Sequence, residues 1–438
     1  MSTSEDAWKV LRSLPMGERI EVTDTNGCRW TGTVIPPHEL SGDRVLSLKL
    51  ASGYNVGIRI GSQVEYRRLA PSPTRRVEAQ EGLPPSATTV PDDGRTVDLL
   101  TTGGTIASRV DYETGGVRPV SDEKEILEFY PELKESGGVR VVPVLDRLSE
   151  NIAPSDWLLL ADKVVASFAR GASGVVIAHG TDTLGFTAAG LSFLLADLPG
   201  PVVLVGAQRS PDRPSSDGPS NIAAAVAVAR DRRLGEVVVV MHETVSDGRF
   251  SVHRGCWVRK MHASRRDAFE SLNGPPLGTV EGTSVHLLPD VRPPARGPPR
   301  VDGPIDERAG LLWFYPGLSP QKAAQFVDGL RGVVLAGTGL GHVSSVHTDW
   351  IRAATKQGVV VAMTTQCLSG TVDPYVYATG RDLLRSGVLY LDDLLPETAY
   401  AKMAWALGRA RAPEEVRRLL SEDRAGEFHH RRRPEATA

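Results

Sequence analysis

Residues 97–107 read VDLLTTGGTIA, and this stretch decides the fold of the larger part of the chain. The mainly apolar run 97–100 leads directly into a turn with two glycines and three threonines. Further apolar runs recur along the chain and alternate with helical segments such as residues 155–170. They occupy residues 139–144, 175–178, 202–205 and 237–241. Short apolar runs separated by helices are typical of parallel strands covered on both faces, so this part is predicted to be an α/β domain.

Two proline-rich segments divide the rest of the chain. Six prolines lie between Pro289 and Pro304, and the apolar runs 311–315, 333–336 and 359–363 after them predict a smaller parallel-sheet α/β domain. Five prolines between Pro71 and Pro91 predict a linker. Before it, residues 18–69 alternate apolar and polar side chains between glycines, which predicts a small N-terminal β-barrel.

These observations give a division of the whole chain. The tail holds the basic run 429–433, which would suit a phosphate contact, but a solvated, disordered tail is the favoured interpretation. We expect a barrel over 1–72, a linker over 73–95, a catalytic α/β domain over 96–288, a proline-rich linker over 289–306, a smaller α/β domain over 307–422 and a tail over 423–438.

Bulk composition excludes several classes of protein. A net charge of −3 on 438 residues gives no general affinity for nucleic acid or membranes. Residues 1–70 carry nine Lys and Arg against eight Asp and Glu, so a protein-contact or spacer role is preferred there over RNA binding. Three widely spaced cysteines, no apolar leader and no run long enough to span a membrane predict a cytoplasmic protein.

The turn at 101–107 places a hydroxyl, that of Thr105, just beyond the carboxyl end of the first strand. Ligands of open α/β sheets bind at that edge, and glycines allow the backbone to approach them closely. Taken alone, the same turn would also serve as an ordinary strand-to-loop connection.

A second polar cluster, HGTDT at 179–183, follows the run 175–178, again at a carboxyl end. Thr181 and Asp182 would bring a hydroxyl and a carboxylate to the same edge of the sheet. The alternative is that Asp182 or Thr183 merely caps the next helix.

Lys260 lies in the segment RKMHASRRDAF, residues 259–269. A lysine there is ordinarily a surface residue. If it lies beside Asp182, however, it can accept the proton of a threonine hydroxyl, so its function depends on that proximity.

Four ordered motifs give the sequence a recognisable relation. They are TGGTIA (102–107), HGTDT (179–183), VGAQRS (205–210) and SDGPSN (216–221). In this order and spacing they resemble the bacterial-type L-asparaginases over residues 96–410. The resemblance implies an amidohydrolase in which a threonine attacks a side-chain amide, backbone N–H groups hold the oxyanion, and ammonia leaves.

The resemblance also assigns roles to single residues. It implies a catalytic group whose members are Thr105, Thr181, Asp182 and Lys260, with Phe269 at the usual distance after the lysine. It implies that Ser149 holds the substrate α-carboxylate, and that Glu150 and Asp182 hold its α-ammonium group.

The mobile lid of the family supplies a tyrosine shortly after the first motif. Here the matching position is Val117, and Tyr112 lies five residues earlier. Tyr112 is therefore the candidate lid tyrosine. No metal or other cofactor is implied, and the histidines show no ligand spacing such as HExxH.

The N-terminal region extends the resemblance to nearly the whole chain. ASGYNVGI (51–58), the lid ASRVDYETGGV (107–117), RKMHASRRDAF (259–269) and LPETA (395–399) are similar to the GatD family, the ammonia-releasing subunits of archaeal glutamyl-tRNA(Gln) amidotransferases. This implies a homodimer inside a heterotetramer with a GatE-like partner. The ammonia, taken from glutamine or asparagine, would go to Glu-tRNA(Gln) on that partner, which uses ATP. This chain has no GxxxxGK[ST] phosphate loop of its own.

Two other functions stay open at this point. A stand-alone cytoplasmic L-asparaginase with an unrelated N-terminal extension would carry the same catalytic residues and need no partner. An inert scaffold would lack Thr105, Thr181 or Lys260, and all three are present. The sequence alone leaves open the choice between glutamine and asparagine and which threonine forms the acyl bond.

Overall fold

The computed structural model describes residues 4–24, 26–36, 44–50, 55–61, 64–69, 95–103, 108–110, 117–119, 130, 138–209 and 216–429. Thr105, Tyr112, most of the expected linker and the basic run after His429 lie outside these residues. Among the described residues, no helix is both long and apolar enough to cross a membrane.

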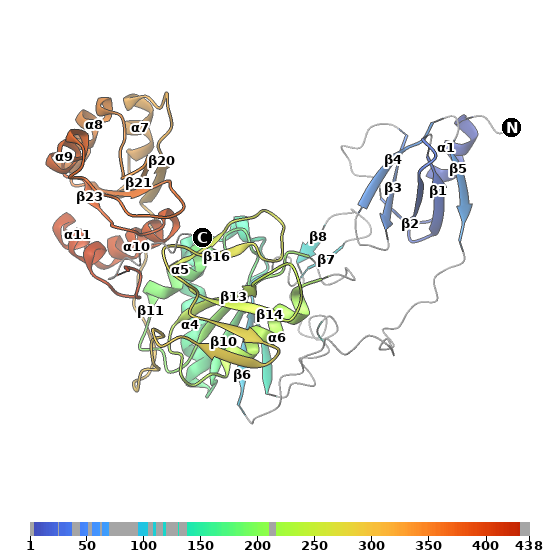
Figure 1. Cartoon of the computed structure of the whole chain (residues 1–438), viewed down its shortest axis with the longest axis horizontal. Helices are drawn as coiled ribbons and strands as arrows, with labels where there is room; N and C mark the ends of the chain where they lie inside the picture. Colours follow the sequence, from blue (N-terminus) through green and yellow to red (C-terminus); the bar gives the residue numbers. More distant parts are fainter. Residues whose placement is uncertain are drawn as a thin grey trace.

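The N-terminal part is an antiparallel sheet of five strands in the order β4-β3-β2-β1-β5 (Figure 1). Along β1 every second side chain is buried, so the period-two pattern reflects one covered face. Helix α1 precedes the sheet, and Leu11 and Leu14 join its core. The small β-barrel predicted here is thus confirmed as an antiparallel β-domain, although β4 and β5, at the two edges of the described sheet, do not pair with each other. The elements are α1 (Ser4–Arg12), β1 (Arg19–Thr23), β2 (Arg29–Ile35), β3 (Val45–Leu50), β4 (Asn55–Arg59) and β5 (Glu65–Arg68).

The large central sheet has eight strands in the order β18-β17-β14-β13-β12-β10-β6-β9. Five neighbouring strands of this sheet, β9, β6, β10, β12 and β13, are parallel, as predicted. They are β6 (Val97–Thr101), β9 (Val139–Pro143), β10 (Gly174–Ala178), β12 (Val202–Val205) and β13 (Val237–His242). Counted in chain order, their arrangement is 2-1-3-4-5, which places the reversal of strand order between β6 and β10. Ligands of doubly wound sheets bind at that reversal, beyond the carboxyl ends.

Three antiparallel strands extend this sheet, which the sequence did not reveal. They are β14 (Arg249–Arg254), β17 (Gly278–Glu281) and β18 (Ser284–Leu287). A short turn that includes Gly248, with φ of +99°, joins β13 to β14. Such a short connection permits only antiparallel pairing, because a parallel pair needs a long crossover.

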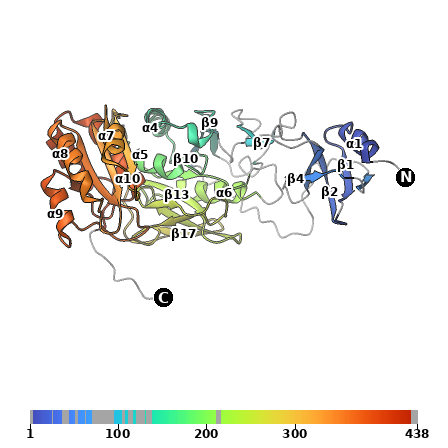
Figure 2. The same ribbon diagram turned by 90° about the horizontal axis from the view of Figure 1, so that it is seen from above.

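Helices cover both faces of the central sheet (Figure 2). Helices α4 and α5 share a core with one face, and α6 packs on the other. Three short two-stranded ribbons complete this part. The elements are η2 (Ser149–Asn151), α4 (Pro154–Ala169), α5 (Leu184–Leu194), α6 (Gly218–Ala229), the ribbons β11 (Leu195–Ala196) with β19 (Arg300–Val301) and β15 (Val258–Lys260) with β16 (Phe269–Ser271), and the pair β7 (Ser108–Val110) with β8 (Val117–Pro119).

The C-terminal part has a parallel sheet, as predicted; the structure shows four strands in sequential order, one more than the three apolar runs indicated. Helix α10 contacts both this sheet and α5, so one apolar core runs through the two α/β parts. The elements are β20 (Ala309–Trp313), α7 (Pro320–Val327), β21 (Gly332–Gly337), η3 (Ser345–His347), α8 (Thr348–Lys356), β22 (Val360–Thr365), α9 (Ala378–Arg385), β23 (Leu389–Tyr390), α10 (Pro396–Arg409) and α11 (Pro413–Ser421).

Residues 423–429, expected to be a solvated tail, are instead packed back onto the chain. Glu427 is buried and pairs with Lys402 of α10 at 2.6 Å, and both side chains are fully inaccessible. His429 stacks on Trp257 with ring centroids 3.9 Å apart. The prediction failed because the charged residues of this segment have buried partners that lie far away in the sequence.

Candidate active site

The candidate site lies beyond the carboxyl ends of β6 and β10, at the reversal of strand order. Lys260 Nζ donates hydrogen bonds of 2.8 Å to both Thr181 Oγ1 and Asp182 Oδ1. Thr181 is buried, whereas the side chain of Asp182 is 69% exposed. The structure therefore brings together three of the four residues expected to catalyse. The proximity on which the interpretation of Lys260 depended is present.

Lys260 reaches this place on the two-stranded ribbon of β15 and β16. Its cross-strand partner is Phe269, which is buried beneath the ribbon. The C-terminal part holds the same ribbon from the other side. Arg259 Nε lies 3.2 Å from Glu397 Oε1, and Thr398 Oγ1 donates to the Cys256 carbonyl at 2.8 Å. The position of the Lys260 ammonium therefore depends on both α/β parts.

Thr183 and Asp182 are not used as side-chain caps of α5. Thr183 lies at the N-cap position, but its hydroxyl donates instead to the Ser149 carbonyl at 2.6 Å, and no side-chain capping bond is made. The Asp182 carboxylate receives its bond from Lys260. Thr183 therefore starts α5 by position only, and neither side chain makes the bond that the capping interpretation of Asp182 or Thr183 required.

Ser149 lies next to this motif, in the single turn η2. It is buried, and an added Cβ on Gly180 would stand only 2.8 Å from Ser149 Cβ. Only glycine therefore allows the loop after β10 to pass so close to Ser149. Glu150, the next residue, is exposed at the same edge.

His179 is a structural residue in this motif. Its ring is fully buried, with Nδ1 2.7 Å from the Gly180 carbonyl oxygen and Nε2 2.9 Å from Thr187 Oγ1. Burial lowers the pKa of His179 to about 4, although the contact with the Gly180 carbonyl opposes this shift. The imidazole is neutral at neutral pH and fixes the course of the loop.

The motifs at 205–210 and 216–221, to which the sequence analysis assigned no role, form a hydrogen-bond network that supports Thr181. The buried Asp217 carboxylate accepts hydrogen bonds from the backbone N–H groups of Gln208 and Arg209. Asn221 Nδ2 donates to the Gly206 carbonyl at 2.9 Å. A Cβ on Gly206 would meet Thr181 Cγ2 at 2.6 Å. The Asp217 network thus holds the Gly206 turn directly against Thr181.

The first motif is described only as far as Gly103. This glycine has φ of +91°, and an added Cβ would stand 2.6 Å from the Arg147 carbonyl oxygen. β6 and β10 are adjacent and parallel, so Gly103 lies at the same edge as Thr181. Among the described residues, no group of three or more His, Cys, Asp and Glu side chains could hold a metal ion.

Comparison with known families matches three consecutive parts of the chain. Residues 14–66 match the GatD N-terminal domain, residues 96–292 match Asparaginase, N-terminal, and residues 308–420 match the Glutaminase/Asparaginase C-terminal domain.

Whole-length relatives agree with these matches. The GatD subunit of glutamyl-tRNA(Gln) amidotransferase from Pyrococcus horikoshii is 45% identical over 406 residues, which cover 91% of each chain. The corresponding protein of Sulfolobus acidocaldarius is 40% identical over 421 residues, covering 95% of this chain and 92% of the relative.

Solved L-asparaginases share the fold of the two α/β parts. The thermostable L-asparaginase of Thermococcus kodakarensis superposes with a TM-score of 0.70 at 32% identity, covering 77% of this chain and all of that one. L-asparaginase I of Vibrio cholerae gives a TM-score of 0.65 at 28% identity, covering 76% of this chain and 99% of that one. The chain therefore belongs to the GatD family of glutamyl-tRNA(Gln) amidotransferase subunits, with amidohydrolase domains of the asparaginase type and a GatD N-terminal domain.

Proposed function

We propose that this chain releases ammonia from the side-chain amide of glutamine or asparagine and passes it to a GatE-like partner, which amidates Glu-tRNA(Gln) with ATP. The observation that carries the hydrolytic step is the pair of 2.8 Å hydrogen bonds from Lys260 Nζ to Thr181 and Asp182. Its whole-length similarity to GatD proteins, including the GatD N-terminal domain, supports the transfer step.

The chemistry follows from the arrangement of these groups. Lys260 Nζ would accept the proton of a threonine hydroxyl while Asp182 stabilises the ammonium that forms. The hydroxyl oxygen attacks the amide carbon, and the C–N bond breaks as the nitrogen takes up a proton and leaves as ammonia. Water then hydrolyses the acyl ester, which gives glutamate or aspartate and restores the threonine. Thr105 and Thr181 are the two candidates for the acylated residue.

The substrate's amino-acid end would lie beside η2. Ser149 would hold the α-carboxylate, and Glu150 and Asp182 would hold the α-ammonium group. Asp182 suits this role because its side chain is exposed while only Oδ1 is bonded to Lys260. Tyr112 is the proposed lid tyrosine.

We also propose that the chain works as a homodimer within a heterotetramer in the cytoplasm. Its three cysteines are free, which suits a reducing compartment. The proposed division into 1–72, 73–95, 96–288, 289–306, 307–422 and 423–438 is supported by the three separate main sheets. Within the last of these segments, residues 423–429 pack against both α/β parts.

A change at Gly180 tests the role of Ser149. In Gly180→Ala, the new Cβ must displace Ser149, so KM for the amide substrate should rise by roughly tenfold to a hundredfold, with a smaller change in kcat. Steady-state ammonia release measures both constants. The matched control is Gly297→Ala, where an added Cβ meets nothing within 4 Å. Equal KM values for the two variants would contradict the placement of the α-carboxylate.

The transfer step is tested by measuring ammonia release from glutamine and asparagine with and without the GatE-like partner and Glu-tRNA(Gln). We expect weak release by the chain alone and a rise of about tenfold or more when both the partner and the charged tRNA are present. Lys260→Ala under the same conditions gives the background. A high rate of asparagine hydrolysis that does not change when the partner and Glu-tRNA(Gln) are added would instead identify a stand-alone asparaginase.

A further inference from the structure

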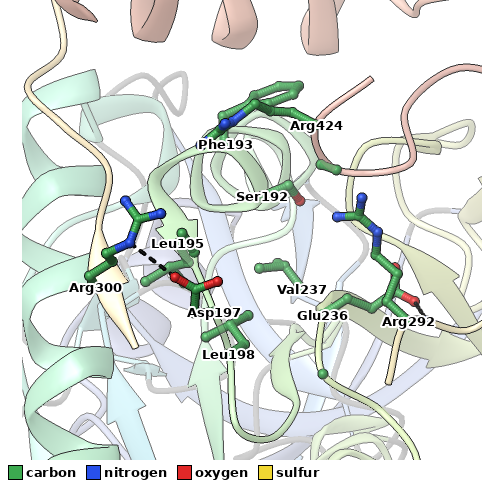
Figure 3. Close-up of a pocket in the computed structure, with 13 residues that line it drawn as sticks. Ser192, Phe193, Leu195, Asp197, Leu198, Glu236, Val237, Arg292, Arg300 and Arg424 are labelled. Carbon is green, nitrogen blue, oxygen red and sulfur yellow. Dashed lines mark hydrogen bonds and ion pairs between the residues drawn. The ribbon is translucent and has the colours of Figure 1, made fainter. Parts of the chain in front are cut away.

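A cavity of about 270 Å³ lies at the opposite end of the central sheet from Lys260. Leu198, Gly235 and Val237 line it, and these residues lie at or just before the amino ends of β12 and β13. Arg292 and Arg300 of the proline-rich segment and Arg424 of the C-terminal segment complete the walls. Figure 3 shows Asp197 and Arg300 on one side of this cavity and Glu236 and Arg292 on the other.

Most of the charged groups here already have partners. Arg300 Nε lies 3.0 Å from Asp197, and Arg424 pairs with the buried Asp302. Glu236 accepts bonds from Arg254 Nε at 2.7 Å and from the backbone N–H of Arg292 at 2.8 Å. These pairs account structurally for every charged side chain in the walls except that of Arg292.

The Arg292 guanidinium has no ion pair or hydrogen bond with any residue that the structure describes, although its backbone is fixed on both sides of the Cα atom. Its N–H is bonded to Glu236, and its carbonyl accepts from Gly235 N at 2.8 Å. The side chain therefore starts from a rigid base and contributes a positive charge to the cavity without a carboxylate of its own.

A charge count over the walls of the cavity gives the same result. Three guanidinium groups, those of Arg292, Arg300 and Arg424, stand against two carboxylates, those of Asp197 and Glu236. A small anion would balance this excess.

We propose that this cavity binds a small phosphate-bearing ligand, with Arg292 as its principal contact. Guanidinium groups match phosphate oxygens with paired hydrogen bonds. Pockets for drug-sized ligands begin at about 300 Å³, so a cavity of this size suits orthophosphate or the phosphate end of a nucleotide. The ligand would join the proline-rich and C-terminal segments to the central sheet, so it would also stabilise their packing. The cavity would bind it whether or not the chain transfers ammonia.

Isothermal calorimetry on the full chain tests the proposal, with orthophosphate and ADP as separate probes and chloride at matched ionic strength as the blank. We expect saturable binding of at least one probe, together with a rise in the thermal unfolding midpoint. Preference for ADP would assign the phosphate to a nucleotide, and preference for orthophosphate would assign it to the free ion.

Arg292→Gln should weaken this binding by about tenfold or more, because it removes a charge-assisted pair while keeping a polar side chain. Arg296→Gln is the matched control, since Arg296 is, like Arg292, an exposed arginine of the same segment but does not line the cavity. Ammonia release should be unchanged in both variants. Absence of saturable binding, or equal affinity in Arg292→Gln and the native chain, would overturn the proposal.

Discussion

Replacing Lys260 by alanine is expected to lower kcat for amide hydrolysis by roughly a thousandfold, within the range that loss of a positioned general base produces. Thr181→Val should cause a loss of similar size, because valine keeps the contact with Gly206 but removes the hydroxyl that receives the Lys260 hydrogen bond. The kcat of each variant is measured from the rate of ammonia release at saturating amide substrate. Thr181→Ser, which retains a hydroxyl, should recover part of the activity.

The double variant is the decisive measurement for this group. If Thr181 and Lys260 act as one unit, combining Thr181→Val with Lys260→Ala should add little to either single loss. Two independent losses that multiply would show that the 2.8 Å contact is not a catalytic one. The unfolding midpoints of all variants, compared with the native chain, control for damage to the ribbon of β15 and β16.

The second large effect is expected on stability. Lys402→Met should lower the free energy of unfolding by about 3–5 kcal/mol, because it leaves the Glu427 carboxylate buried without its charge partner. Burial lowers the pKa of Lys402 and raises the pKa of Glu427, while their mutual attraction opposes both shifts. The lysine also donates to the carbonyls of Leu420 and Glu422 at the end of α11, so these acceptors lose their donor as well.

Arg418→Met provides the matched control for this pair. Arg418 forms its ion pair with Glu422 on the exposed surface of the same C-terminal region. Exposed pairs of this kind contribute at most about 1 kcal/mol. The midpoint of urea denaturation should therefore fall strongly in Lys402→Met and only slightly in Arg418→Met. Similar urea midpoints for the two variants would mean that solvent reaches the Lys402–Glu427 pair.

The sequence predicted the parallel strands because each of them is a short apolar run that ends in a turn. It placed Thr181 and Asp182 at the right edge of the sheet for the same reason. The strand pattern could not place Lys260, which only the family resemblance assigned to the site, because the ribbon that carries this lysine is fixed by contacts with Glu397 and Thr398, more than a hundred residues away in the chain. The Asp217 network escaped notice since a buried aspartate that bonds backbone N–H groups looks, in a sequence, like any turn residue.

The antiparallel strands β14, β17 and β18 show a second limit of sequence patterns. Their runs are short, and β18 alternates exposed and half-buried residues at the edge of the sheet, so hydrophobicity alone gives a weak signal. The C-terminal segment shows a third. Glu427 and Arg424 are ordinary surface residue types, and only their distant partners Lys402 and Asp302 make them part of the interior.

The packing of residues 423–429 also sets an order in which parts of the interior can be completed during synthesis, because Lys402 and Trp257 are translated before their partners Glu427 and His429. Lys402 has no carboxylate partner until residue 427 has been made. Truncations before residue 427, and changes that hold residues 423–429 away from the rest of the molecule, therefore act on its interior.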